Sequence, residues 1–304
     1  MTPLQLSLVQ WKNNFFIPIQ NENSKLAGAI LRLIEQQRDG QGIDQGLVKK
    51  LLDSFVSLGL NKADISETCL DMYEEHFEIP FLETTERYYT LKSEAFLAEN
   101  SVSEYLKKAE EWLREEEGRV EGYLNTVTRK PLIDRCERVL IREHFNLIQE
   151  TFRNSLNCDE NEDLRIIYVL LARIPDGLEP LRDRFEEHVK RAGLVAITRL
   201  VGDGGGTTQI DPKAYVDALY EVYRGGFEMV ERSFEGDTDF VARLDKACRD
   251  FVNENAATRG SSTKSSDLMV KYADDFLRKN RTCEEGLESA LSRAVCASPC
   301  SFSI

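Results

Sequence analysis

Cysteine and histidine could form a nucleophilic catalytic pair, and Cys69 and His76 lie seven positions apart. A helix would place both on the same side, two turns apart. A cysteine–histidine pair needs direct hydrogen-bond contact and a third group that orients the base. Seven residues of helix rise about 10 Å, so the side chains cannot touch. The favoured interpretation is a packed cysteine and a histidine at the core's rim, and no catalytic residue is predicted.

Metal ligands are the next candidates. His144 and His188 have no cysteine or acidic neighbour at a spacing that suits zinc. Cys283, Cys296 and Cys300 could hold a metal in principle, but the tail around them is expected to be frayed. We therefore expect neither a metal nor a cofactor.

A glycine-rich run, Gly202-Asp203-Gly204-Gly205-Gly206-Thr207-Thr208, suggests a phosphate-binding loop. It lacks the Gly-Lys-Ser/Thr ending and follows no predicted strand. A surface loop between helices is the favoured interpretation.

Composition excludes several classes of protein. The chain has 304 residues, 39 basic and 53 acidic, with a formal net charge of -14. Binding to nucleic acid or to anionic membranes needs a concentrated positive surface, and no Lys/Arg run is present. The longest apolar run, residues 166–172, is far too short to span a bilayer, and no secretory signal opens the chain.

Cysteine usage favours an intracellular protein. The seven cysteines are odd in number and scattered. Cys69, Cys136 and Cys248 fall on apolar faces of expected helices, where a reduced cysteine acts as a small hydrophobe.

The elements that must position these residues are all helices. The clearest runs from Val102 to Leu124, with apolar residues at three- and four-residue steps. Ser101 and Glu104 form a capping box at its start. The other expected helices cover residues 4–17 (ended by Pro18), 26–38, 43–56, 65–77 (ended by Pro80), 131–152, 164–174, 178–196, 212–223, 240–251 and 268–277. The sequence predicts an all-α protein.

Charged residues cover the opposite face of the helix from Val102 to Leu124. Three acids each precede a base by four residues, an order that stabilises an exposed helix: Glu104 with Lys108, Glu110 with Arg114, and Glu115 with Arg119. The acidic run Glu115-Glu116-Glu117 is expected to be part of this solvated face.

An internal repeat divides the chain. Four landmarks recur in the same order: Asp39-Gly40 as Asp176-Gly177, Phe77/Phe81 as Phe234/Phe240, residues 96–100 as 251–255, and residues 108–114 as 272–278. We predict helical repeats at 1–128 and 129–280, stacked as a stiff rod, and a divergent tail at 281–304. The polar run 254–265 is the best linker candidate. The alternative is chance similarity between amphipathic helices.

Several separated motifs resemble the amino-terminal region of cullins. They are Phe81-Leu82, Thr85-Glu86-Arg87-Tyr88-Tyr89, Glu94-Ala95-Phe96-Leu97, Val102, Tyr105, Lys108-Ala109-Glu110, Glu116, Arg119, Tyr123-Leu124, Leu244 to Phe251, Ser266-Asp267-Leu268, Tyr272, Asp275 and Leu277. The Leu244-Asp245-Lys246-Ala247-Cys248 run is most similar to cullins that scaffold F-box-type ubiquitin ligases. The likeness covers about residues 4–280.

The resemblance implies an elongated stalk of five-helix repeats and a non-catalytic scaffold role. Its partners would be an adaptor with an F-box receptor, a RING-finger protein and a cullin-associated exchange factor. The chain resembles the second and third repeats. Most of the adaptor-binding first repeat has no counterpart, and residues 296–304 do not resemble the family's continuation. Two alternatives stay open: a short regulatory product that competes for partners of the stalk, and an unrelated helical tethering protein.

The resemblance also leaves two local alternatives. Cullin-like packing could use Glu116 inside the repeat instead of on a solvated face. Trp11, Phe15 and Phe16 are expected in the core, or exposed if a preceding repeat is absent.

Overall fold

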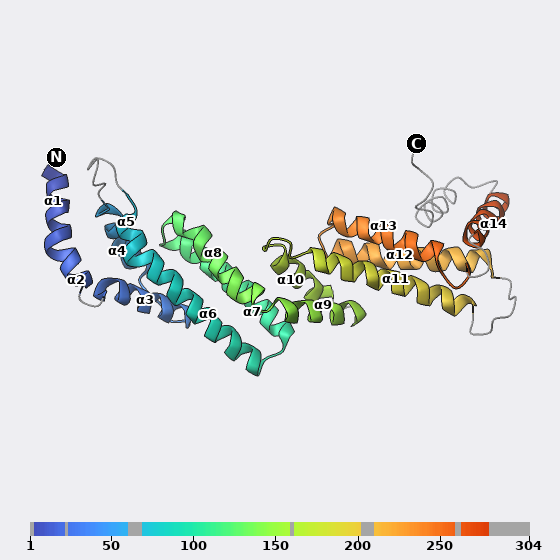
Figure 1. Ribbon diagram of the computed structural model, residues 1–304, viewed down its shortest axis with the longest axis horizontal. Coiled ribbons are helices and arrows are strands. Elements are labelled where there is room, and N and C mark those ends of the chain that lie inside the picture. The colour runs from blue at the N-terminus through green and yellow to red at the C-terminus, as the bar shows by residue number, and fades with distance from the viewer. Residues whose placement is uncertain are drawn as a thin grey trace. The chain divides into compact units, whose positions relative to one another are not determined.

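The computed structural model describes residues 3–21, 24–59, 69–158, 161–201, 210–258 and 263–279. Every regular element in these ranges is a helix (Figure 1). The predicted all-α fold is therefore confirmed. None of these helices combines the length and the apolar character that crossing a membrane requires.

The chain forms two compact units, Met1–Phe145 and Asn146–Ile304. The elements of the first are α1 (Pro3–Trp11), a π-helical turn (Lys12–Phe16), α2 (Ile17–Asn21), α3 (Lys25–Arg38), α4 (Gln45–Ser57), α5 (Asp71–Tyr73), a π turn (Glu74–Glu78), α6 (Ile79–Glu99), α7 (Val102–Gly122), a 3-10 turn (Thr126–Thr128), α8 (Arg129–Glu137) and a π turn (Arg138–Arg142). Its core is aromatic: Phe16 meets Phe55 edge-on at 4.8 Å, and Phe77 stacks on Phe81 at 5.3 Å.

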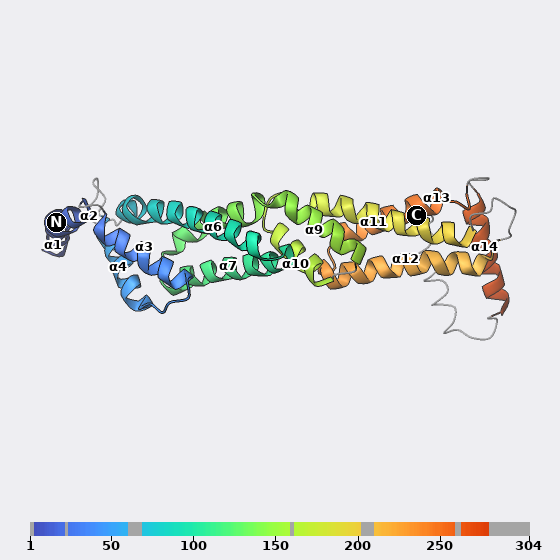
Figure 2. The same cartoon turned by 90° about the horizontal axis from the view of Figure 1, so that it is seen from below.

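The second unit holds α9 (Phe145–Cys158), which begins at the boundary, α10 (Asn161–Leu171), α11 (Glu179–Val201), α12 (Pro212–Ser233), α13 (Thr238–Asn253) and α14 (Lys264–Lys279). Helices α11, α12 and α13 lie side by side (Figures 1 and 2), and α14 packs on α12. Phe234 stacks on Phe240 at 4.2 Å, and Phe185 meets Phe234 edge-on at 5.6 Å. Each unit thus has its own aromatic core.

The contact-defined boundary lies at residues 145 and 146, whereas the repeat boundary was predicted at 128 and 129. Helix α8 accounts for the difference, because it packs against α6 and α7 of the first unit. The repeat boundary itself stays a prediction. The helix expected at 131–152 is interrupted by the π turn Arg138–Arg142 and a turn at 143–144.

Two prolines expected to end helices do not end them. Pro18 is the second residue of α2 and Pro80 the second residue of α6, and a π turn comes directly before each helix. The amides of Ile17 and Ile79 donate to carbonyls five residues back, so each wide turn closes just before the proline. Proline cannot donate to the carbonyl four residues earlier. The Gln20 side chain fills that role for Pro80, donating to the His76 carbonyl at 3.3 Å.

Helix α7 begins as predicted. Ser101 and Glu104 form the capping box, with the Ser101 amide donating to the Glu104 carboxylate at 2.9 Å. Among the predicted surface pairs, Arg114 binds Glu110 at 2.9 Å and Arg119 binds Glu115 at 3.4 Å. Lys108 binds Glu111 instead of Glu104, because the Glu104 carboxylate is used by the cap.

The described part of the expected linker is tied to the second unit's core. Asn255 is buried and its side-chain amide donates to the Tyr215 hydroxyl at 3.1 Å. That hydroxyl also lies 2.8 Å from the Ser265 hydroxyl at the start of α14. Residues 254–258 are therefore a structured connection, and the linker interpretation is wrong for them.

Candidate functional site: the buried Glu116 cluster

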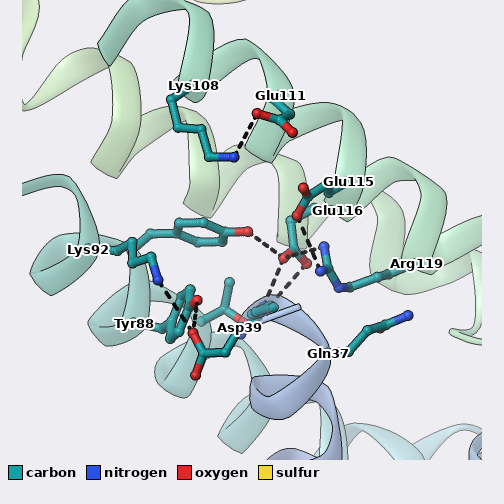
Figure 3. Close-up of polar contacts among 12 residues, drawn as sticks. Gln37, Asp39, Tyr88, Lys92, Lys108, Glu111, Glu115, Glu116 and Arg119 are labelled. Carbon is teal, nitrogen blue, oxygen red and sulfur yellow. Dashed lines mark hydrogen bonds and ion pairs between the residues drawn. The ribbon is translucent and has the colours of Figure 1, made fainter. Parts of the chain in front are cut away.

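Three helices of the first unit bring polar side chains together in its interior (Figure 3). Arg38 lies in the last turn of α3, where a cation is favoured by the helix dipole. Thr85 and Tyr89 lie four residues apart on α6, and Glu116 and Arg119 three apart on α7, so each pair shares a helix face. We call these five residues the Glu116 cluster.

The Glu116 carboxylate is the centre of the cluster. Its Oε1 accepts from Arg38 Nε at 2.8 Å, from the Tyr89 hydroxyl at 2.6 Å and from Arg119 Nη1 at 3.1 Å. Its Oε2 accepts from Arg38 Nη2 at 3.0 Å. The Arg38 contact is thus bidentate, the strongest and most directional form of this ion pair.

The Arg38 guanidinium is enclosed on its remaining sides. Nη2 also donates to the Thr85 hydroxyl at 2.8 Å, and that hydroxyl donates to the Phe81 carbonyl at 2.7 Å. The rings of Phe81, Tyr88 and Tyr89 lie 5.3 to 5.4 Å from the guanidinium carbon. Contacts at this distance add cation–π attraction.

Burial and charge act in opposite directions on the cluster's titration. The Glu116 side chain is 0% exposed and that of Arg38 is 2% exposed. Burial acts to raise the pKa of Glu116, but the charges of Arg38 and Arg119 and the hydrogen bonds from Arg38 and Tyr89 outweigh it and lower the pKa. Burial, and next the Glu116 charge, raise the pKa of Tyr89. Glu116 is therefore a carboxylate held ionised inside a core.

A second layer of polar contacts surrounds the cluster near the end of α3 (Figure 3). Asp39 accepts from the Tyr88 hydroxyl at 2.8 Å and pairs with Lys92 at 3.4 Å. Gln37 accepts from the Tyr123 hydroxyl at 2.7 Å. These contacts tie α3 to α6 and to the end of α7.

The cluster is built to hold helices together and not to react. Every hydrogen bond of the Glu116 carboxylate goes to a side chain of the cluster, and the Glu116 side chain is 0% exposed, so the carboxylate is closed to a substrate. The expectation that Glu115-Glu116-Glu117 forms a solvated face is wrong for Glu116. The alternative, that Glu116 is used in packing within the repeat, describes what the structure shows.

The other candidates from the sequence lie elsewhere. Cys69 is in the loop before α5 and not on a helix face, so the helical register that would align it with His76 is absent. The prediction that it lies on an apolar helix face is wrong. Cys136 and Cys248 are buried in helices, as predicted. His144 lies in a turn, 3.3 Å from the Ser93 hydroxyl, and burial lowers its pKa.

The amino-terminal aromatic residues divide between core and surface. Phe16 is buried, whereas Trp11 and Phe15 are 54% and 53% exposed and stack on each other at 4.9 Å. The core position expected from the sequence therefore holds for Phe16, and the exposed alternative holds for Trp11 and Phe15.

The glycine-rich run 202–208 and the cysteines Cys283, Cys296 and Cys300 lie outside the described residues. Within the described ranges, no group of histidine, cysteine and acidic side chains is arranged to hold a metal ion.

Sequence reasoning missed Arg38 as the partner of Glu116. A charged residue in the last turn of an amphipathic helix is ordinarily read as a solvated C-terminal base. A signal was nevertheless present, since Thr85, Tyr89, Glu116 and Arg119 all occur in the motifs that carried the family resemblance. Polar residues within such motifs point to a buried network.

Comparison with known proteins decides the family. A sequence model of the cullin alpha solenoid domain matches residues 3–296. The chain belongs to the cullin family. The match continues beyond residue 280, into the segment that the sequence predicts as a divergent tail.

Individual cullins support this assignment. The chain is 43% identical to Cullin-1 of Dictyostelium discoideum over 94% of its own length and 37% of that relative. It is 39% identical to Cullin-1 of Schizosaccharomyces pombe, over 95% of this chain and 38% of the relative. Cullin-1 of Caenorhabditis elegans is 34% identical over 90% of this chain. The chain thus spans somewhat more than a third of the length of these cullins.

Proposed function

We propose that this chain is a non-catalytic scaffold segment of a cullin–RING ubiquitin ligase, acting in ubiquitin-dependent protein degradation. The family match over residues 3–296 carries the proposal. Its physical support is the Glu116 cluster, in which charged side chains join helices and are closed to ligands. A scaffold must keep its shape, and these buried contacts hold the helices in fixed positions.

The mechanism would be positional. A scaffold that holds a substrate receptor and a ubiquitin-charged conjugating enzyme at fixed separation makes the attack effectively intramolecular. The whole protein would bind an adaptor with an F-box receptor, a RING-finger protein and a cullin-associated exchange factor. It would work in the cytoplasm and nucleus.

Purification of the tagged gene product from its own cells tests the assignment. We expect a RING-finger protein and an F-box adaptor to co-purify with the whole protein of which this chain is proposed to be a segment. A product that retains stalk-binding proteins but lacks the RING-finger protein would favour the competing regulatory product instead. Absence of all of these proteins contradicts the ligase proposal.

The positional mechanism needs its own test. A short flexible Gly-Ser segment inserted at residues 143–144 separates the two units by a mobile joint. The matched control carries the same insertion at the exposed loop residue Gly42. In the complete ligase, the insertion at 143–144 should slow ubiquitin transfer while partner binding stays normal, and the control should not. Equal transfer by both variants contradicts the mechanism.

A further inference from the structure

Arginines make up half of the residues that line a pocket in the second unit. Helix α9 contributes Arg153 and Leu156, and α11 contributes Arg184, Glu187, His188 and Arg191. We call it the α9–α11 pocket. Its three arginines face one carboxylate, in a chain whose formal net charge is -14. A local excess of positive charge on such a chain calls for a physical reason.

The helices place these residues together by spacing. Arg184, His188 and Arg191 follow one another at four- and three-residue steps, so they share one face of α11. The facing helix is fixed by a hydrogen bond from Arg191 Nη2 to the Asn157 side-chain oxygen at 2.7 Å. The pocket therefore has a defined shape on both sides.

The arginines of this pocket lack strong ionic partners. Arg153 is 3.9 Å from Glu150, and both side chains are more than half exposed. Arg191 bonds to a neutral amide. Arg184 makes no hydrogen bond or ion pair with any residue that the structure describes.

Another face of the same helix offers a direct contrast. There the cations are matched by acids: Arg182 pairs with Glu179, Asp237 and Asp239, Arg243 with Glu179, Asp183 and Glu186, and Lys246 with Glu186. The cations between α11 and α13 are thus paired with acidic side chains. The arginines between α9 and α11 lack comparable acidic partners.

The spacing of the arginines favours a peptide that lies across the pocket over a single small ion inside it. Arg184 and Arg191 are seven residues apart, which separates their positions by about 10 Å along the helix axis. An extended peptide advances about 3.3 Å per residue and points alternate side chains the same way. Acidic side chains a few residues apart can therefore reach both guanidinium groups, each of which favours bidentate contact with a carboxylate.

We propose that the α9–α11 pocket docks an acidic segment of a partner protein, with carboxylates paired to Arg184 and Arg191 and with Arg153 at the rim. The buried Leu156 side chain lines the floor of the pocket. This proposal does not depend on the ubiquitin ligase role, because the pocket lies within one unit.

Fluorescence anisotropy tests the pocket with a labelled peptide of alternating Glu and Gly, titrated with the whole 304-residue chain. We expect saturable binding that weakens as salt screens the charges. The double variant Arg184→Gln/Arg191→Gln should bind about tenfold more weakly or worse, a loss of at least about 1.4 kcal/mol. Its circular dichroism should match the unchanged chain.

The matched control removes two exposed arginines elsewhere, Arg32→Gln and Arg165→Gln, and should bind as the unchanged chain does. An equal loss of affinity in the control would show that binding depends only on the net charge of the chain, and it would overturn the proposal. The absence of saturable binding up to millimolar concentrations of the chain would overturn it as well. Inorganic phosphate and a phosphoserine peptide form the third arm. Binding of either without binding of the Glu peptide would assign the pocket to phosphate instead.

Discussion

At the scale of single residues, the cost of burying the Glu116 charge is offset inside the cluster itself. Taking a carboxylate out of water costs several kcal/mol, roughly, and attraction to a buried base recovers this only with good geometry and satisfied hydrogen bonds. Glu116 has a bidentate contact to Arg38 and further donors in Tyr89 and Arg119. Compared with apolar packing, such a cluster adds directional contacts. The bidentate contact of the Arg38 guanidinium with Glu116 forms in only one register of α3 against α7.

Removing the central carboxylate tests this account. Glu116→Ala leaves the buried Arg38 guanidinium without its counter-charge, so we expect the free energy of unfolding of the first unit to fall by about 3–5 kcal/mol. Urea unfolding followed by tryptophan fluorescence measures this change. Both tryptophans lie in the first unit, and Trp112 is 4% exposed and near Tyr89.

The neighbouring residue provides the control. Glu115 also pairs with Arg119, but its side chain is 39% exposed. Glu115→Ala should therefore cost at most about 1 kcal/mol. Similar losses for the two variants would show that Glu116 contributes no more than a surface pair.

The lowered pKa of Glu116 predicts a pH dependence. Because the folded chain holds this carboxylate ionised more strongly than the unfolded chain does, the unfolded state takes up the proton first as pH falls. The contribution of Glu116 is complete above its ordinary pKa of 4.5 and is lost as pH falls through the folded value. The stability difference between the unchanged chain and Glu116→Gln should be constant from neutral pH to about pH 5 and should narrow below that. Urea unfolding at a series of pH values measures it, and a difference that widens in acid contradicts the assignment.

At the scale of elements, the close approach of α11 to α13 depends on a missing side chain. A Cβ atom at Gly193 would lie 2.5 Å from ring carbons of Phe251, which is itself buried. Glycine inside a helix ordinarily costs about 1 kcal/mol relative to alanine. Here that cost is offset because the ring packs directly onto the α11 backbone.

Alanine in place of glycine usually stabilises a helix, but at position 193 we expect it to destabilise the packing. Gly193→Ala should destabilise the second unit by about 1–3 kcal/mol, since the added methyl group overlaps the buried Phe251 ring and forces it to shift. Hydrogen exchange of peptides from α11 and α13 measures the change. Gly225→Ala on α12 is the control. No atom lies within 4 Å of its Cβ position, so it should stabilise by up to about 1 kcal/mol. A stabilising Gly193→Ala would contradict the packing argument.

Some landmarks of the repeat that the sequence predicts have local counterparts in the structure. Asn100 and Asn255 occupy equivalent positions, and each side-chain amide donates to the carbonyl of the phenylalanine four residues earlier, at 3.0 and 2.9 Å. The paired phenylalanines Phe77/Phe81 and Phe234/Phe240 are stacked in both cases. Such correspondences are predictable because side-chain period and capping chemistry are local.

The elements that sequence analysis did not predict depend on contacts distant in sequence. The helix continues through Pro80 because a π turn precedes the proline. The side chain of Gln20, far away in the chain, also donates to the His76 carbonyl in place of the missing proline amide. Glu116 is buried because Arg38, 78 positions away, meets it. Local periodicity cannot specify either partner, so the helices were predictable and the Glu116 cluster was not.

At the scale of the whole molecule, the chain has two cores, and different contacts stabilise each of them. The first unit is held by the Glu116 cluster, and the second by the close packing of α11 with α13 and by the Asn255–Tyr215 contact. No residue of one set is a partner in the other. Substitutions in sites that share no partners generally have additive effects on stability.

Combining the two substitutions therefore tests whether the units are energetically independent. In Glu116→Ala/Gly193→Ala, tryptophan fluorescence should report the same loss as Glu116→Ala alone, within about 0.5 kcal/mol. Hydrogen exchange of α11 and α13 peptides should report the same loss as Gly193→Ala alone, because those helices lie in the other contact-defined unit. If Glu116→Ala lowered protection in α11 and α13 as much as in α6 and α7, the units would unfold as one cooperative body. Stability would then have to be assigned to the chain as a whole.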